Sequence, residues 1–140
     1  MALAGAGWEV TAVDFATGIF DKLPPEMETS GVDYRSGDAF AFAEGPFDLI
    51  YDYTFFCAIS PGRRPEVGAM AARLLRTGGL FAAVVYPIGK DPAAGGPPHG
   101  VAVNDYNDAL GSEFDLVESA APTCLPGKRF GYAWSVWQRS

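Results

Sequence analysis

The chain has 140 residues, a hydrophobic content of 49% and a formal net charge of −7. This length suits one domain, and the hydrophobic content is enough for a packed core and too high for a disordered chain. The acidic balance argues against nucleic acid as a partner, because phosphate binding needs clustered Lys and Arg.

Other classes of protein are excluded by short-range features. The sequence has no run of about 18 apolar residues, so we expect no membrane span, and its N-terminus lacks the pattern of a signal peptide. Cys57 and Cys124 give neither a disulfide framework nor a metal-ligand spacing, which predicts a reducing, cytosolic setting and no metal site. The single histidine, His99, lies in a Gly-Pro loop, where a turn or surface role is more expected than catalysis.

The first half of the chain predicts short elements. Residues 2–6 resemble the tail of a helix closed by glycines, and residues 8–14 alternate and are rich in β-formers, which indicates a strand. Residues 15–31 are mixed, with a break at Pro24-Pro25 and room for a short helix. Two further strands are predicted over residues 32–38 and 47–53.

The second half begins with a helix over residues 64–76, with Pro65 near its start and Gly78-Gly79 closing it. Its apolar face is formed by residues at helical spacing: Val67, Met70, Ala71, Leu74 and Leu75. Residues 80–88 are apolar without alternation, as in a strand that is buried on both faces.

A loop rich in Gly and Pro follows over residues 89–100. Asn104 can cap a short helix that runs through 110, with three side chains turned inward: Tyr106, Ala109 and Leu110. The last two strands, 114–120 and 132–139, are close enough in sequence to pair antiparallel.

The alternation of strands and helices predicts one α/β domain with a mostly parallel sheet and helices on both faces. Ligands of such sheets bind at the carboxyl ends of the strands, where Asp14, Asp38 and the pair Asp52-Tyr53 fall. A carboxylate there can accept hydrogen bonds from ribose hydroxyls or an exocyclic amine, and an aromatic ring can cover a base or face a cation. Any one of these acids alone is more simply a turn residue; three at one edge favour a binding site.

Four stretches of the sequence are informative together: "GWEVTAVDF", "FDLIYDYTFFCAISPGRRP", "LLRTGGLFAAVVYPI" and "GGPPHGV" followed by "VNDY". They resemble the class I S-adenosylmethionine-dependent methyltransferases, and more narrowly the thiol and halide methyltransferase branch of the thiopurine methyltransferase superfamily. The resemblance implies a Rossmann-like methyltransferase sheet, mostly parallel, with an antiparallel C-terminal hairpin. It also implies S-adenosyl-L-methionine as the cofactor and a small-molecule, anionic acceptor: a halide, thiocyanate, bisulfide or a thiol.

The resemblance assigns roles to five positions. Asp14 resembles the acid that holds the cofactor ribose, and Asp38 with Ala39 resembles the pair beside the adenine. Tyr53 resembles the residue that lines the methionine end of the cofactor, and Arg64 resembles an arginine near the acceptor. Asp52 and Tyr53 would form the rim of the site, with Phe55 and Phe56 as a wall behind it or simply as core. A solvated residue at a helix start is an equally good interpretation of Arg64.

The family begins with a closing segment, a first strand and a Gly-rich loop, and none of these is recognisable in the sequence. We therefore expect an N-terminally truncated domain whose sheet leaves unpaired edges that favour self-association. Two alternatives to a methyltransferase stay open: a nicotinamide-binding dehydrogenase, and a non-catalytic remnant that acts as a binding module. Titration with S-adenosylhomocysteine and NAD would separate the three.

Overall fold

The computed structural model describes residues 2–24 and 30–140. The chain forms two compact units, residues 1–43 and residues 44–140, which are described separately below. Part of the predicted break at Pro24-Pro25 lies outside the described residues. Within the described ranges, no helix combines the length and the apolar character that a membrane span requires.

The first unit is built on two parallel strands. Helix α1 (Ala2–Gly5) precedes strand β1 (Val10–Asp14), which pairs with β2 (Val32–Ser36) in a register that runs from Val10↔Val32 to Asp14↔Ser36. The 3-10 helices η1 (Phe20–Lys22) and η2 (Ala39–Ala41) follow the two strands. No residue of either strand is fully buried, so little apolar packing holds this ladder.

The second unit is a four-stranded mixed sheet in the order β3-β4-β6-β5. Its strands are β3 (Phe47–Tyr53), β4 (Leu75–Ile88), β5 (Phe114–Ser119) and β6 (Gly131–Arg139). β3 and β4 pair in parallel, whereas β6 runs antiparallel to both β4 and β5. The predicted antiparallel hairpin is therefore confirmed, and its second strand is the one that joins it to the parallel pair.

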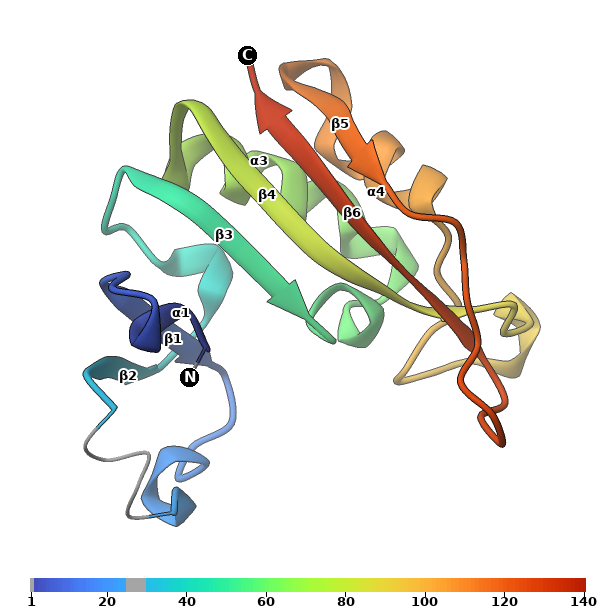
Figure 1. The fold of residues 1–140 in the computed structure, drawn as a ribbon, viewed down its shortest axis with the longest axis horizontal. Helices are drawn as coiled ribbons and strands as arrows, with labels where there is room; N and C mark the ends of the chain where they lie inside the picture. Colours follow the sequence, from blue (N-terminus) through green and yellow to red (C-terminus); the bar gives the residue numbers. More distant parts are fainter. Residues whose placement is uncertain (1, 25–29) are drawn as a thin grey trace. The chain divides into compact units, whose positions relative to one another are not determined.

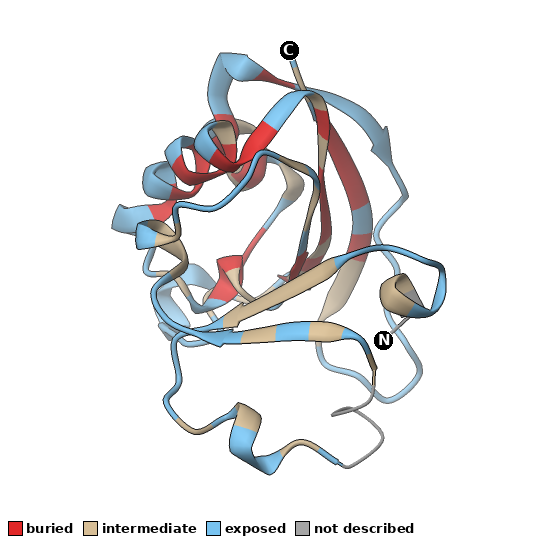
Figure 2. Ribbon diagram, turned by 90° about the vertical axis from the view of Figure 1, so that its left-hand side faces the viewer, coloured by how far each residue is buried: buried red, intermediate tan, exposed pale blue. Residues whose placement is uncertain are grey.

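Helices α3 (Arg64–Leu74) and α4 (Val103–Leu110) pack side by side on one face of this sheet (Figure 1). Gly68 allows their close approach, since a Cβ atom at this position would lie 2.0 Å from the carbonyl oxygen of Ala109. Figure 2 shows that buried residues gather on these helices and on the strands of the second unit. The core includes the predicted inward residues: Val67, Met70, Ala71, Leu74, Tyr106, Ala109 and Leu110.

Several predicted boundaries differ from the structure. The helix ends at Leu74 because Leu75 is already extended, at φ −89° and ψ 145°, and β4 begins there instead of at residue 80. Gly78 and Gly79 lie in an irregular start of β4, between the pairs Phe47↔Leu75 and Leu49↔Leu80. Gly79 is required there, because a Cβ atom would lie 2.8 Å from the carbonyl oxygen of Arg76.

Three other expectations also differ. Asn104 is not the N-cap of α4; the N-cap is Ala102, two residues earlier, and the Asp105 carboxylate accepts a hydrogen bond from the Ala102 backbone N–H at 2.7 Å. The described strands form two separate ladders instead of one sheet: β1 pairs with β2, and the other four described strands pair with one another. The helices of the second unit both lie on one face of its sheet, not on both faces.

Candidate functional site

Two of the predicted acids lie at the carboxyl ends of the two neighbouring strands of the first unit. Asp14 is the last residue of β1, and Asp38 follows the end of the parallel strand β2 by two residues. The ladder continues past the strand end, since the Gly37 N–H donates to the Asp14 carbonyl oxygen at 2.8 Å. The structure thus brings the carboxyl ends of both strands together, as the ligand edge of a parallel sheet requires.

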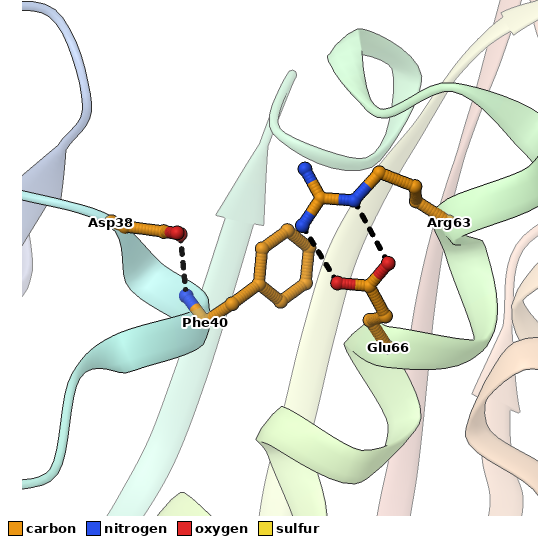
Figure 3. Close-up of polar contacts among 4 residues, drawn as sticks. All are labelled: Asp38, Phe40, Arg63 and Glu66. Carbon is orange, nitrogen blue, oxygen red and sulfur yellow. Dashed lines mark hydrogen bonds and ion pairs between the residues drawn. The ribbon is translucent and has the colours of Figure 1, made fainter.

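Both carboxylates also make the local bonds that the turn interpretation predicts. Asp14 Oδ1 accepts from the Ala16 N–H at 2.8 Å, and Asp38 Oδ1 accepts from the Phe40 N–H at 2.9 Å (Figure 3). Asp38 is in this way the N-cap of η2, whose first residue is Ala39. Both acids are exposed to solvent. An ionised carboxylate has about four acceptor positions, so one turn bond leaves capacity for a ligand hydroxyl or amine.

At the carboxyl end of β3, neighbouring residues face opposite ways. Tyr53 has 66% of its surface exposed, whereas Asp52 is 3% exposed. Asp52 accepts three hydrogen bonds: Oδ1 from the Phe55 N–H at 2.9 Å, and Oδ2 from the Phe56 N–H at 3.2 Å and the Tyr106 hydroxyl at 3.0 Å. The predicted rim therefore needs correction. Tyr53 is open to solvent, while Asp52 faces inward, because successive strand residues point to opposite faces.

The pKa values of Asp52 and Tyr106 are both shifted in this buried site. Burial raises the pKa of Asp52 above its ordinary value, against the opposing effect of the three hydrogen bonds. Burial and then the nearby Asp52 charge raise the pKa of Tyr106, which therefore stays a neutral hydrogen-bond donor. Burial also raises the pKa of the Cys57 thiol, so that side chain is not an activated nucleophile.

Arg64 is buried, so its interpretation as a solvated residue is wrong. It is 9% exposed, and its Nη2 donates to the Gly100 carbonyl oxygen at 2.9 Å. Its Nη1 lies 3.5 Å from Asp105 Oδ2, and the guanidinium centre is 4.9 Å from the centroid of the Phe56 ring. Arg64 thereby ties the loop before α4 to the start of α3, and a direct contact with the acceptor stays a prediction.

The neighbouring arginine behaves as a surface residue. Arg63 donates to both carboxylate oxygens of Glu66, from Nε at 2.8 Å and from Nη2 at 2.6 Å (Figure 3). This i,i+3 pair is about half exposed, so it contributes on the order of 0.5 kcal/mol. Of these two adjacent arginines, Arg64 is buried and Arg63 is exposed.

An open hollow of ≈ 510 Å³ lies beyond the end of β4. Its lining combines two cations, one acid and apolar groups: Gly89, Lys90, Asp91, Ala94, Pro98, Arg129 and Phe130. Lys90 Nζ donates to the carbonyl oxygen of Pro98. The described residues contain no cluster of three or more His, Cys, Asp or Glu side chains that could hold a metal ion.

Sequence reasoning missed two features of this region. Tyr106 was placed on the inward face of its helix, but its partner was not identified, although a buried tyrosine hydroxyl usually has one. The hollow was missed because Lys90 and Arg129 are 39 positions apart, and no local pattern joins them.

Comparison with known proteins decides the family. The family model for thiopurine S-methyltransferase matches residues 1–136. The chain belongs to this family. The predicted resemblance is thereby confirmed for nearly the whole chain, and the nicotinamide-binding dehydrogenase is set aside.

Within the family, the chain is similar to plant proteins. It is 41% identical over 101 residues to "Probable thiol methyltransferase 2" of Arabidopsis thaliana, which is 71% of this chain and 42% of that protein. It is 45% identical over 64 residues to "Thiocyanate methyltransferase 1" of Brassica oleracea, which is 46% of this chain and 27% of that protein. The chain thus spans less than half the length of these relatives.

Solved structures confirm the fold. A SAM-dependent methyltransferase from Methanosarcina mazei matches with a TM-score of 0.75 at 15% identity, over 99% of this chain and 85% of that one. A TehB-like SAM-dependent methyltransferase from Corynebacterium glutamicum matches with a TM-score of 0.73 at 16% identity, over 99% and 72% respectively. This member of the thiopurine S-methyltransferase family therefore has the Rossmann-like methyltransferase fold.

Proposed function

We propose that the protein takes part in S-adenosylmethionine-dependent methyl transfer to a small anionic nucleophile: a halide, thiocyanate, bisulfide or a thiol. The observation that carries the proposal is the pair of acids at the carboxyl ends of β1 and β2, in a chain of this family. Relatives named for thiol and thiocyanate methylation support the acceptor class.

The residues of the first unit fit the nucleoside part of the cofactor. Asp14 would accept from the ribose hydroxyls, and Asp38 with the Ala39 backbone would lie beside the adenine. Both carboxylates are exposed, and both belong to turns whose geometry is fixed by their own hydrogen bonds. A pre-positioned carboxylate loses little conformational freedom when a ligand binds, which favours affinity.

Tyr53 would line the methionine end of the cofactor. When bound, the cofactor supplies an electrophilic methyl group on a sulfonium. An acceptor that is already an anion needs no general base, so the chain's task is to align the reactants and exclude water. This matches the chemistry available at the end of β3, where Tyr53 is exposed and Asp52 is occupied by internal hydrogen bonds.

Lys90 and Arg129 would attract the anion. Both line the hollow beyond Ile88, which lies four residues past Val84, the partner of Tyr53 in the ladder. That separation is roughly 13 Å along an extended strand, so the two cations would steer the acceptor toward the site and not contact the reacting atoms. Local positive charge is needed because the chain as a whole carries −7.

The decisive experiment measures methyl iodide and methyl thiocyanate in the headspace after incubation with S-adenosylmethionine and the matching anion. We expect product with the wild type and less with Asp14→Ala. Arg129→Gln should raise the KM for the anion, while Lys128→Gln, one residue away and outside the hollow lining, should not. Absence of product with iodide, thiocyanate, bisulfide and an aromatic thiol would refute the proposal.

A non-catalytic binding module is the second candidate. Among the described strands, β1, β2, β3 and β5 each pair with a single neighbour, and unpaired strand edges promote self-association. Binding of S-adenosylhomocysteine without turnover would support this candidate. We also propose a cytoplasmic location, since Cys57 and Cys124 are both free thiols.

A further inference from the structure

The turn that follows β3 is held by one buried carboxylate. Both oxygens of Asp52 accept hydrogen bonds, and two of the three donors are the consecutive backbone N–H groups of Phe55 and Phe56. These bonds run from Asp52, near the end of β3, to the N–H groups of Phe55 and Phe56, at the start of the 3-10 helix η3 (Phe56–Ala58). Asp52 thus fixes the direction in which the chain leaves the strand.

Thr54 lies inside this turn in a strained conformation. Its φ is 71°, and it is the only residue other than glycine with positive φ in the described ranges. A β-branched residue in this region is a conformational outlier that persists only where its surroundings impose it. Here Thr54 lies between Asp52 and the residues that donate to it, Phe55 and Phe56, so these hydrogen bonds constrain its backbone. In addition, Cys57 Sγ donates to the Thr54 carbonyl oxygen at 3.3 Å.

The third donor links the turn to a helix that is distant in sequence. The Tyr106 hydroxyl, from α4, donates to Asp52 Oδ2 at 3.0 Å. The Tyr106 ring stacks on Phe56, with centroids 3.9 Å apart, and on Trp137, with centroids 5.1 Å apart. Trp137 Nε1 in turn donates to Asn107 Oδ1 at 2.7 Å. The turn is therefore attached to α4 and, through Trp137, to strand β6.

We propose that Asp52 and Tyr106 are positioning residues that set the place of Tyr53 at the edge of the sheet. Neither faces solvent, so neither contacts the reactants; they act through the strained turn that starts at Tyr53. This inference rests on the proposed function, in which Tyr53 lines the methionine end of the cofactor. Loss of the link would let Thr54 relax and Tyr53 move, and a displacement of about 1 Å can reduce a rate roughly 100-fold.

The test uses Tyr106→Phe and Asp52→Asn. Tyr106→Phe removes one hydroxyl and keeps the ring stacking, so the fold is expected to survive. Asp52→Asn places an NH₂ group opposite a backbone N–H that now donates to the carboxylate, so it weakens the hydrogen bonds that hold the turn. Asp48→Asn is the matched control, because it makes the same change on the same strand at an exposed carboxylate that pairs with Arg76.

Two measurements are made on each folded variant. For Tyr106→Phe we expect kcat to fall about 10- to 100-fold with little change in the KM for the anion, and Asp52→Asn to lose more. If the two residues served only stability, the variants would have a lower folded fraction but the same kcat per folded molecule. That result would overturn the proposal. Asp48→Asn should stay within about twofold of the wild type, as expected for an exposed pair.

The second measurement does not depend on activity. We expect amide hydrogen exchange at Phe55 and Phe56 to accelerate about tenfold or more in Tyr106→Phe, and the Tyr53 ring signals to shift, with neither change in Asp48→Asn. If the wild type shows no methyl transfer, the proposed function fails while this result still decides whether the pair positions Tyr53. Unchanged exchange and unchanged Tyr53 signals in Tyr106→Phe would refute the positioning role.

Discussion

Replacing Gly68 by alanine tests the contact on which α4 is placed. The new Cβ atom would lie 2.0 Å from the Ala109 carbonyl oxygen and 3.0 Å from the carbonyl carbon, so α3 and α4 must move apart by roughly 1 Å or more to reach van der Waals distance. The obstacle is backbone, which cannot rotate away as a side chain can. Such overpacking costs about 3 kcal/mol, at the upper end of the usual range.

Helix propensity acts in the opposite direction. Gly68 lies in the middle of α3, where alanine is favoured over glycine by about 1 kcal/mol. The net expected destabilisation is therefore about 2 kcal/mol. It should appear as a lower urea midpoint and, for a domain of this size, as a fall in Tm of roughly 8 °C.

Gly62→Ala is the control for this prediction. No heavy atom lies within 4 Å of the place that a Cβ atom on Gly62 would take, and Gly62 does not have a positive φ, so its replacement should change stability by less than about 0.5 kcal/mol. Equilibrium urea unfolding, followed by tryptophan fluorescence, measures both variants. A Gly68→Ala protein that is as stable as the wild type or more stable would show that the helices are not in such close contact.

Three further outcomes are expected. Asp14→Ala should weaken the binding of S-adenosylhomocysteine, measured by isothermal titration, by about 1.5–3 kcal/mol, and equal affinities would leave Asp14 as a turn residue only. Thr54→Gly should raise the free energy of unfolding by about 1 kcal/mol, because relief of the positive φ exceeds the entropy cost of glycine; a less stable variant would contradict this. The pKa of Asp52 is raised above its ordinary value of 3.8, so the stabilisation linked to its protonated form is present below about pH 3.8 and is lost as pH rises through the raised pKa. The difference in unfolding free energy between wild type and Asp52→Asn should therefore fall as pH rises above about 4, and a flat or rising difference would refute that sign.

Local sequence patterns predicted most of the helices and strands, because the spacing of apolar residues along the chain differs between a helix and a strand and marks the buried face. The alternation in β1, the apolar run of β4 and the inward face of α4 all follow from residues within ten positions of one another. The same is true of Asp14 and Asp38, which were identified as candidates from their places after strands. The family was recognised from short stretches such as "DYTFFCAI", whose residues are adjacent.

Only the tertiary structure decided which way the polar side chains face. A strand places successive residues on opposite faces, but the sequence does not say which face is covered, so Asp52 was expected beside Tyr53 at the rim. Two helices on one face of the sheet bury Asp52 and leave Tyr53 exposed. Arg64 is buried for a similar reason, because its partners Gly100 and Asp105 come from a loop and a helix about 40 residues away. Contacts between distant segments depend on how the chain folds back, and no local period encodes them.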